Sequence, residues 1–130
     1  MLNQRPRLLL IDDDPEFRAL FLHLLQGRYL VTAACEGEEG YLKAVTNRPD
    51  AIVLDLNMPG WYGVDTLIAI RTHARLRHVP VLVLSGDSRR PNVLAALDAG
   101  ADGFLIKEQF SRSEIIRRLN ILMPFAEVAL

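Results

Sequence analysis

Four short runs of apolar residues recur along the chain without the alternating polar residues of a strand that has one wet face. They are 8–11, 51–54, 81–84 and 104–106. Continuous runs of this kind are typical of parallel strands that helices cover on both faces. A fifth run, 29–34, is more mixed, which is typical of an edge strand. The sequence therefore predicts five strands of a buried parallel sheet.

Helical patterns lie between these strands. Apolar residues from Phe17 to Leu25 repeat at helical spacing, Asp14 suits the N-cap and Pro15 suits the first turn. Further helices are expected over 37–47, 63–76, 90–99 and 112–123, the last capped by Ser111. Strands that alternate with single helices need right-handed crossovers. The fold class expected is α/β, an open doubly wound sheet with five helices on its two faces.

Composition and charge fit one domain and exclude several function classes. The chain has 130 residues, of which 50% are hydrophobic and 24% are charged, and its net charge is −1. Without a basic field, direct binding of nucleic acid by this segment is not expected. No apolar run approaches the roughly 20 residues of a membrane span, and residues 1–6 lack the apolar core of a signal peptide. A single cysteine allows no internal disulfide, so a cytoplasmic location is predicted.

Polar residues stand at the carboxyl ends of four predicted strands. Asp12 and Asp13 follow the first strand, Asp55 the third, Ser85 the fourth and Lys107 the fifth. In an open parallel sheet these ends share one edge, where ligands bind. Carboxylates so close repel one another unless a cation lies among them, and such oxygen ligands suit Mg²⁺. With a lysine and a hydroxyl to contact anionic oxygens, the set supports phosphoryl transfer onto Asp55.

The same positions carry a resemblance to the receiver domain of two-component response regulators. Its motifs here are Ile11-Asp12-Asp13-Asp14-Pro15, Leu54-Asp55-Leu56-Asn57-Met58-Pro59-Gly60, Leu84-Ser85-Gly86 and Ala99-Gly100-Ala101-Asp102-Gly103-Phe104-Leu105-Ile106-Lys107. The resemblance implies a flavodoxin-like sheet with strand order 2-1-3-4-5. It also implies a single receiver domain over 1–130, with a core at about 5–123.

The resemblance assigns the phosphoacceptor and the metal ligands. Asp55 would accept a phosphoryl group from a histidine kinase. Asp12, Asp13, Asp55 and the backbone carbonyl of Asn57 would hold Mg²⁺. The expected function is a phosphorylation-dependent signalling switch, and not an enzyme beyond the phosphorylation and dephosphorylation of its own aspartate.

Further residues are assigned to phosphate contact, switching and dephosphorylation. Ser85 and Lys107 would contact phosphoryl oxygens, and Ser85 would act with the ring of Phe104 as the switch. A fixed core position for Phe104 is the alternative. Asn57 and Asp87, two residues beyond Asp55 and Ser85, would flank the path of the water that removes the phosphoryl group.

Three kinds of partner follow from the same resemblance. A sensor histidine kinase or a phosphotransfer protein would supply the phosphoryl group. An output domain or another partner would bind the face formed by helix 90–99, strand 104–106 and helix 112–123. A homodimer is also compatible with this face.

Two departures from the family pattern bear on the site. Glu108 stands where many receivers have a proline joined by a cis bond, and a cis bond to another residue costs about 2.5–4 kcal/mol. We therefore expect a trans bond there. Trp61 and Tyr62 occupy a loop that usually carries smaller or polar residues. One ring packing over the loop and an exposed pair that selects a partner are both open interpretations.

Two other function classes compete with the switch. A phosphohydrolase of the haloacid dehalogenase type also uses an aspartate nucleophile, but that class carries an Asp-x-Asp motif after its first strand. Here the candidate nucleophile follows the third strand, and Asn57 replaces the second acid. A flavodoxin-like cofactor binder would need a hydroxyl- and glycine-rich loop after the first strand, where this chain has three acids.

Overall fold

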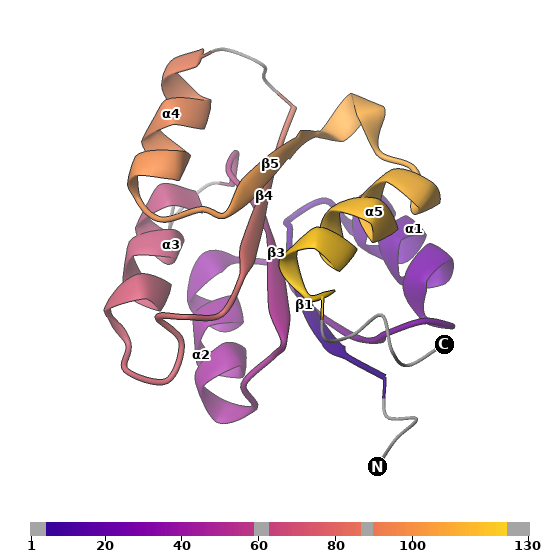
Figure 1. Cartoon of the computed structure of the whole chain (residues 1–130), viewed down its shortest axis with the longest axis horizontal. Helices are drawn as coiled ribbons and strands as arrows, with labels where there is room; N and C mark the ends of the chain where they lie inside the picture. Colours follow the sequence, from indigo (N-terminus) through magenta and orange to yellow (C-terminus); the bar gives the residue numbers. More distant parts are fainter. Residues whose placement is uncertain (1–4, 59–62, 87–89, 125–130) are drawn as a thin grey trace.

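The computed structural model describes residues 5–58, 63–86 and 90–124, and a five-stranded sheet runs through its centre (Figure 1). The strands are β1 (Arg7–Ile11), β2 (Leu30–Ala34), β3 (Ala51–Asp55), β4 (Val81–Ser85) and β5 (Gly103–Ile106). All neighbouring pairs are parallel, and the order is β2-β1-β3-β4-β5. The predicted strand order and the edge position of 29–34 are confirmed.

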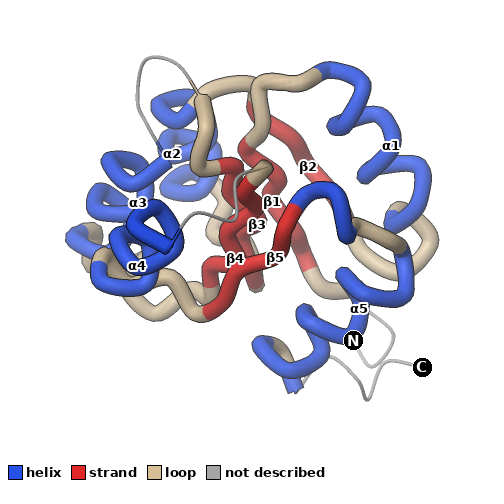
Figure 2. Tube along the Cα trace, turned by 90° about the horizontal axis from the view of Figure 1, so that it is seen from above, coloured by secondary structure: helices blue, strands red, loops and turns tan. Residues whose placement is uncertain are grey.

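Within the described residues, five α-helices cover the two faces of this sheet. They are α1 (Pro15–Leu25), α2 (Gly37–Thr46), α3 (Gly63–Thr72), α4 (Arg90–Asp98) and α5 (Arg112–Leu122), and a short 3-10 helix, η1 (Lys107–Gln109), follows β5. Figure 2 shows α1 and α5 on one side of the strands and α2, α3 and α4 on the other. The sheet is therefore doubly wound, as predicted.

The core has two halves because the strands bury both of their faces. In β1, Leu8 and Leu10 pack toward α1 and α5, whereas Leu9 and Ile11 pack toward α2 and α3. All four side chains are buried. This two-sided burial explains why the strands read as continuous apolar runs.

The helix starts depend on local side-chain caps. The Asp14 carboxylate accepts a hydrogen bond from Glu16 N–H at 3.0 Å, and the Ser111 hydroxyl accepts one from Glu114 N–H at 3.2 Å. Both caps were expected from the sequence, because such side chains satisfy N–H groups that have no partner within the helix.

Helix α3 is shorter than predicted. It was expected to reach residue 76 but ends at Thr72. After it, the ring Nδ1 of His73 accepts a hydrogen bond from Arg75 N–H at 3.1 Å, a local bond that competes with helix continuation. Leu76 is buried from the turn that follows.

Three remaining expectations concern the peptide bond before Glu108, the pair Trp61 and Tyr62, and membrane-spanning helices. No peptide bond within the described ranges is cis, so the Lys107–Glu108 bond is trans as expected. Trp61 and Tyr62 lie outside the described residues, so both interpretations of this pair stay open. In the part of the chain that the structure covers, no helix is long and apolar enough to cross a membrane.

Candidate functional site

Three carboxylates meet at the carboxyl edge of the sheet. One oxygen each of Asp12, Asp13 and Asp55 lie within 4.8 Å of one another. Asp12 follows β1 and Asp55 is the last residue of β3, and these strands are paired neighbours. Asp12 and Asp55 are 0% and 3% exposed, whereas Asp13 is exposed. The cluster therefore has a buried floor and one ligand that faces solvent.

Backbone N–H groups orient the two buried carboxylates. Asp14 N–H donates to Asp12 Oδ1 at 2.8 Å, and Asn57 N–H donates to Asp55 Oδ1 at 2.9 Å. Each carboxylate is thus held by the residue two places further along the chain, as in an Asx-turn. The carbonyl of Asp12 also accepts a hydrogen bond from Arg18 Nη1 at 2.9 Å.

Lys107 brings a positive charge to these acids from β5, the edge strand furthest from β2. It directly follows β5, and its Nζ lies 2.8 Å from Asp12 Oδ2 and 3.5 Å from Asp55 Oδ2. Burial lowers the pKa of this ammonium, but contact with Asp12 and attraction to Asp55 outweigh burial and raise its pKa above the ordinary value. The lysine is therefore firmly charged.

The buried carboxyl of Asp12 is costly to ionise. Burial raises its pKa, Lys107 and the Asp14 N–H lower it, and the nearby Asp55 raises it again, so that the net shift is upward. Its Oδ2 is buried and receives no well-directed hydrogen bond from the described residues, although Lys107 Nζ forms the 2.8 Å ion pair. A second cation beside this oxygen would relieve the strain of burial and repulsion.

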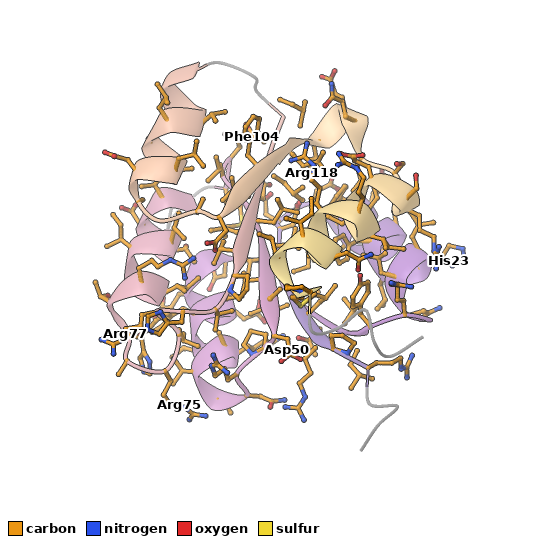
Figure 3. All side chains as sticks on the ribbon, viewed as in Figure 1. His23, Asp50, Arg75, Arg77, Phe104 and Arg118 are labelled. Atoms are coloured by element: carbon orange, nitrogen blue, oxygen red, sulfur yellow. The ribbon has the colours of Figure 1, made fainter. Side chains whose placement is uncertain are left out.

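Ser85 and Phe104 occupy the two neighbouring strands. Ser85 is the buried last residue of β4, paired with Ile106 of β5. Phe104 is partly buried, and its carbonyl accepts a hydrogen bond from Arg118 Nη1 of α5 at 2.8 Å; Figure 3 labels both residues. Asp55 and Ser85 are the last residues of β3 and β4, whereas the sequence predicted that they directly follow these strands. Asp87 lies outside the described residues.

The pocket beside Phe104 opens between helices α4 and α5. It has a volume of about 510 Å³, and Val93, Leu94, Gln109 and Arg118 contribute to its lining. Phe104 is also one of its lining residues. Phe104 also packs against the core cluster on the α2, α3 and α4 side of the sheet, so the switch role and the fixed core position both stay open.

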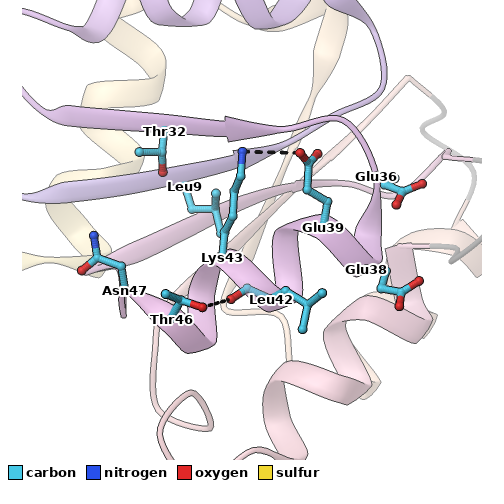
Figure 4. Close-up of a pocket in the computed structure, with 9 residues that line it drawn as sticks. All are labelled: Leu9, Thr32, Glu36, Glu38, Glu39, Leu42, Lys43, Thr46 and Asn47. Carbon is cyan, nitrogen blue, oxygen red and sulfur yellow. Dashed lines mark hydrogen bonds and ion pairs between the residues drawn. The ribbon is translucent and has the colours of Figure 1, made fainter.

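A larger pocket, of about 750 Å³, lies between α2 and the edge strand β2, away from the acid cluster (Figure 4). Lys43 crosses it, donates to the carbonyl of Ala33 at 2.7 Å and pairs with Glu39 at 3.5 Å. The side chain of Lys43 thus covers the open edge of β2. The acid cluster, and not this pocket, brings together groups that can do chemistry.

Comparison with known proteins decides the family. The sequence model of the response regulator receiver domain matches residues 8–120. The chain belongs to this family. It is a receiver domain, and its relatives act in phosphorylation-dependent signalling.

Curated relatives of this receiver domain include regulators and chemotaxis proteins. The transcriptional regulatory protein PrrA of Mycobacterium tuberculosis is 42% identical over 119 residues, which are 91% of this chain and 50% of PrrA. The chemotaxis protein CheY of Pseudomonas aeruginosa is 32% identical over 103 residues, which are 78% of this chain and 83% of CheY. The chain spans about half the length of the PrrA proteins that it matches.

Solved structures agree with this family. The Vibrio cholerae chemotaxis protein CheY4 superimposes with a TM-score of 0.86 at 28% identity, covering 91% of this chain and 98% of CheY4. The receiver domain of the sensor histidine kinase PA1611 from Pseudomonas aeruginosa has a TM-score of 0.86 at 27% identity, covering 92% and 98% of the two chains. That structure holds a magnesium ion in its active site cleft. These relatives do not support the phosphohydrolase alternative.

Several residues that shape the receiver site were not singled out by the sequence. Phe17 was expected only as an apolar helix residue, yet its ring centroid lies 4.5 Å from Lys107 Nζ. Arg18 holds the backbone of Asp12, and Gly63 lets α3 begin against the backbone of Asp55. Helical spacing predicted that Phe17 is buried, but no local pattern predicts its contact with Lys107.

Gly63 to Ala should destabilise this receiver domain by about 2 kcal/mol, the usual cost of overpacking. An added Cβ would lie 2.5 Å from Leu56 Cα and 2.8 Å from the Asp55 carbonyl oxygen, both backbone atoms that have little freedom to move. Urea unfolding measures the change. Gly27→Ala is the matched control, because a Cβ there meets nothing within 4 Å. Equal stability of the two variants would show that α3 can shift at no cost.

Proposed function

We propose that Asp55 accepts a phosphoryl group from a histidine kinase or a phosphotransfer protein, and that the resulting aspartyl phosphate switches the partner-binding face. The observation that carries the proposal is the pairing of a buried, oriented Asp55 carboxylate with a charged lysine 3.5 Å away. A nucleophile beside a fixed cation suits the transfer of an anionic group.

The transfer needs no redox step. An oxygen of the Asp55 carboxylate forms a bond to phosphorus, while the bond from phosphorus to the donor's nitrogen or oxygen breaks. The donor group leaves with the electron pair of that bond. In this proposal Lys107 and the Ser85 hydroxyl contact phosphoryl oxygens, and so offset the charge that the group brings.

The residues at this edge fit Mg²⁺. Asp12, Asp13 and Asp55 offer hard oxygen ligands within 4.8 Å of one another, and Asp13 keeps the site open to solvent. The backbone carbonyl of Asn57 completes the proposed protein ligands. When bound, the ion would supply positive charge that offsets the carboxylates and the phosphoryl oxygens. The magnesium in the PA1611 receiver domain supports this choice of cation.

Mg²⁺ should raise the melting temperature of the wild-type protein. A ligand at ten times its Kd contributes about 1.4 kcal/mol to the folded state. For a domain of this size that corresponds to roughly 5 °C. The shift should shrink in Asp13→Asn, which removes one proposed ligand without touching the buried floor. Differential scanning calorimetry with and without Mg²⁺ measures both, and an equal shift in the two proteins would contradict the site.

The switch is proposed to link the phosphoryl group to the face formed by α4, β5 and α5. A phosphoryl group adds about −1.5 to −2 charge and three acceptor oxygens. Movement of the Ser85 hydroxyl toward one of them would leave space for the ring of Phe104, which already lines a pocket in this face. Reversing a 1:99 population needs about 5.5 kcal/mol, to which charge-assisted contacts from Ser85 and Lys107 contribute.

The partners and the lifetime of the phosphoryl group belong to the same proposal. An output domain, a separate partner or a second copy of the chain would bind the α4, β5 and α5 face; PrrA, which is named a transcriptional regulatory protein, supports an output partner. Asn57 and Asp87 would influence hydrolysis of the aspartyl phosphate. A cytoplasmic location and a single receiver domain over 1–130 stay predictions.

Beryllofluoride with Mg²⁺, a mimic of the phosphoryl group, tests the switch. We expect backbone NMR shifts at Asp55 and also along β5 and the start of α5, including Phe104 and Arg112. Changes confined to the acid cluster, with β5 and α5 unmoved, would show binding without switching. Turnover of a generic phosphate ester would favour the phosphohydrolase alternative instead.

A further inference from the structure

The ammonium of Lys107 contacts an aromatic ring as well as the two acids. Its Nζ lies 4.5 Å from the ring centroid of Phe17, which is the third residue of α1. Cations within about 6 Å of a ring centroid are attracted to the negative face of the ring. Lys107 is thus held by carboxylates and by a π-system that come from different parts of the chain.

Two further aromatic rings pack near Phe17. Its centroid lies 5.0 Å from that of Phe110 at 65°, and 6.2 Å from that of Phe21 at 44°. The rings of Phe21 and Phe110 stack at 5.9 Å. Phe17 is 9% exposed and Phe21 is fully buried. The ring of Phe17 is therefore packed beside Lys107 and is not a mobile surface group.

The ring and the carboxylates act differently when charge at the site changes. Any cation that engages Asp12 and Asp55 weakens their attraction for the lysine, and it also repels the ammonium. The attraction of an uncharged ring persists under those conditions. The ring also excludes water from one side of the ammonium, whose side chain is only 21% exposed, so the remaining interactions are less screened.

We propose that Phe17 is a positioning residue for Lys107, keeping its ammonium beside Asp55 when the carboxylates are engaged. The inference rests on the proposed function, because it assumes that Lys107 meets the phosphoryl oxygens during transfer to Asp55. Phe17 itself touches no reacting atom. Its effect is to reduce the freedom of the long lysine side chain before the phosphoryl donor arrives.

Replacing the ring by Leu tests this role. In Phe17→Leu, the rate of phosphorylation by acetyl phosphate at saturating Mg²⁺ should fall about fivefold, in line with the strength of such contacts. Phe17→Tyr keeps the aromatic face and should restore most of the rate. Phe21→Leu is the matched control, because it removes a ring from the same cluster and leaves the Phe17–Lys107 contact in place.

A spectroscopic readout separates positioning from packing. The methylene protons beside Lys107 Nζ should show an upfield ring-current shift in the wild type, Phe17→Tyr and Phe21→Leu, and lose it in Phe17→Leu. Thermal unfolding checks that each variant is folded. Phe17→Met, which also lacks the ring, replaces Phe17→Leu if the latter does not fold.

The outcomes distinguish this inference from the proposed function. If the wild type is labelled on Asp55 and Phe17→Leu is labelled equally fast, the positioning role is wrong and the phosphoacceptor stands. An equal loss of rate in Phe17→Leu and Phe21→Leu would mean that packing alone is responsible, which also overturns the inference. Absence of labelling in the wild type would instead refute the proposed function, whatever the NMR spectra of Lys107 show.

Discussion

Replacing Asp55 by Asn should abolish labelling of this receiver domain by acetyl phosphate in Mg²⁺. The amide has no anionic oxygen to attack phosphorus, and it also removes one of the three clustered carboxylates. Asp55 is buried at the end of β3, with Oδ1 held by the Asn57 N–H and Oδ2 near Lys107. Intact mass measurement after brief incubation gives the extent of labelling.

The matching control is Asp98→Asn, which removes an exposed carboxylate from the end of α4 and should leave labelling unchanged. Asp13→Asn should slow the reaction, because it removes a proposed metal ligand and not the nucleophile. Labelling that survives in Asp55→Asn but disappears in Asp13→Asn would overturn the choice of phosphoacceptor.

Replacing Arg71 by Lys should lower the free energy of unfolding by about 3 kcal/mol. The guanidinium donates through Nε to the carbonyl of Gly100 at 2.9 Å, through Nη1 to that of Val79 at 2.8 Å, and through Nη2 to Asp102 Oδ2 at 2.8 Å. One ammonium cannot reproduce this planar set of donors. Two charge-assisted bonds to part-buried carbonyls account for about 3 kcal/mol, and the half-exposed Asp102 pair adds little.

Urea unfolding measures this change, and Arg77→Lys is its control because Arg77 is exposed on the segment between α3 and β4 (Figure 3). Arg71 holds the segments that lead into β4 and β5, at the amino ends of these strands. The acid cluster lies at the carboxyl ends. Labelling of Asp55 in folded Arg71→Lys should therefore be unchanged. Wild-type stability of this variant would show that the guanidinium bonds contribute nothing beyond what water supplies.

The sequence alone predicted the layers of this fold and the membership of its acid cluster. Continuous apolar runs bounded by helical patterns are typical of strands buried on both faces, and cap residues such as Asp14 and Ser111 act within a few residues of themselves. Parallel strands also bring their carboxyl ends to one edge. The meeting of Asp12 and Asp55 thus follows from topology, although the strand order itself came from the family resemblance.

Only the tertiary structure decided which side chains meet across the layers. Arg71 bonds to Gly100, 29 residues away, and Lys107 meets the ring of Phe17 because α1 and η1 follow different strands at the same edge of the sheet. The early end of α3 likewise depends on a turn that buries Leu76. A local sequence pattern indicates periodicity and burial. Which distant side chain a residue contacts depends on how each helix packs on the sheet.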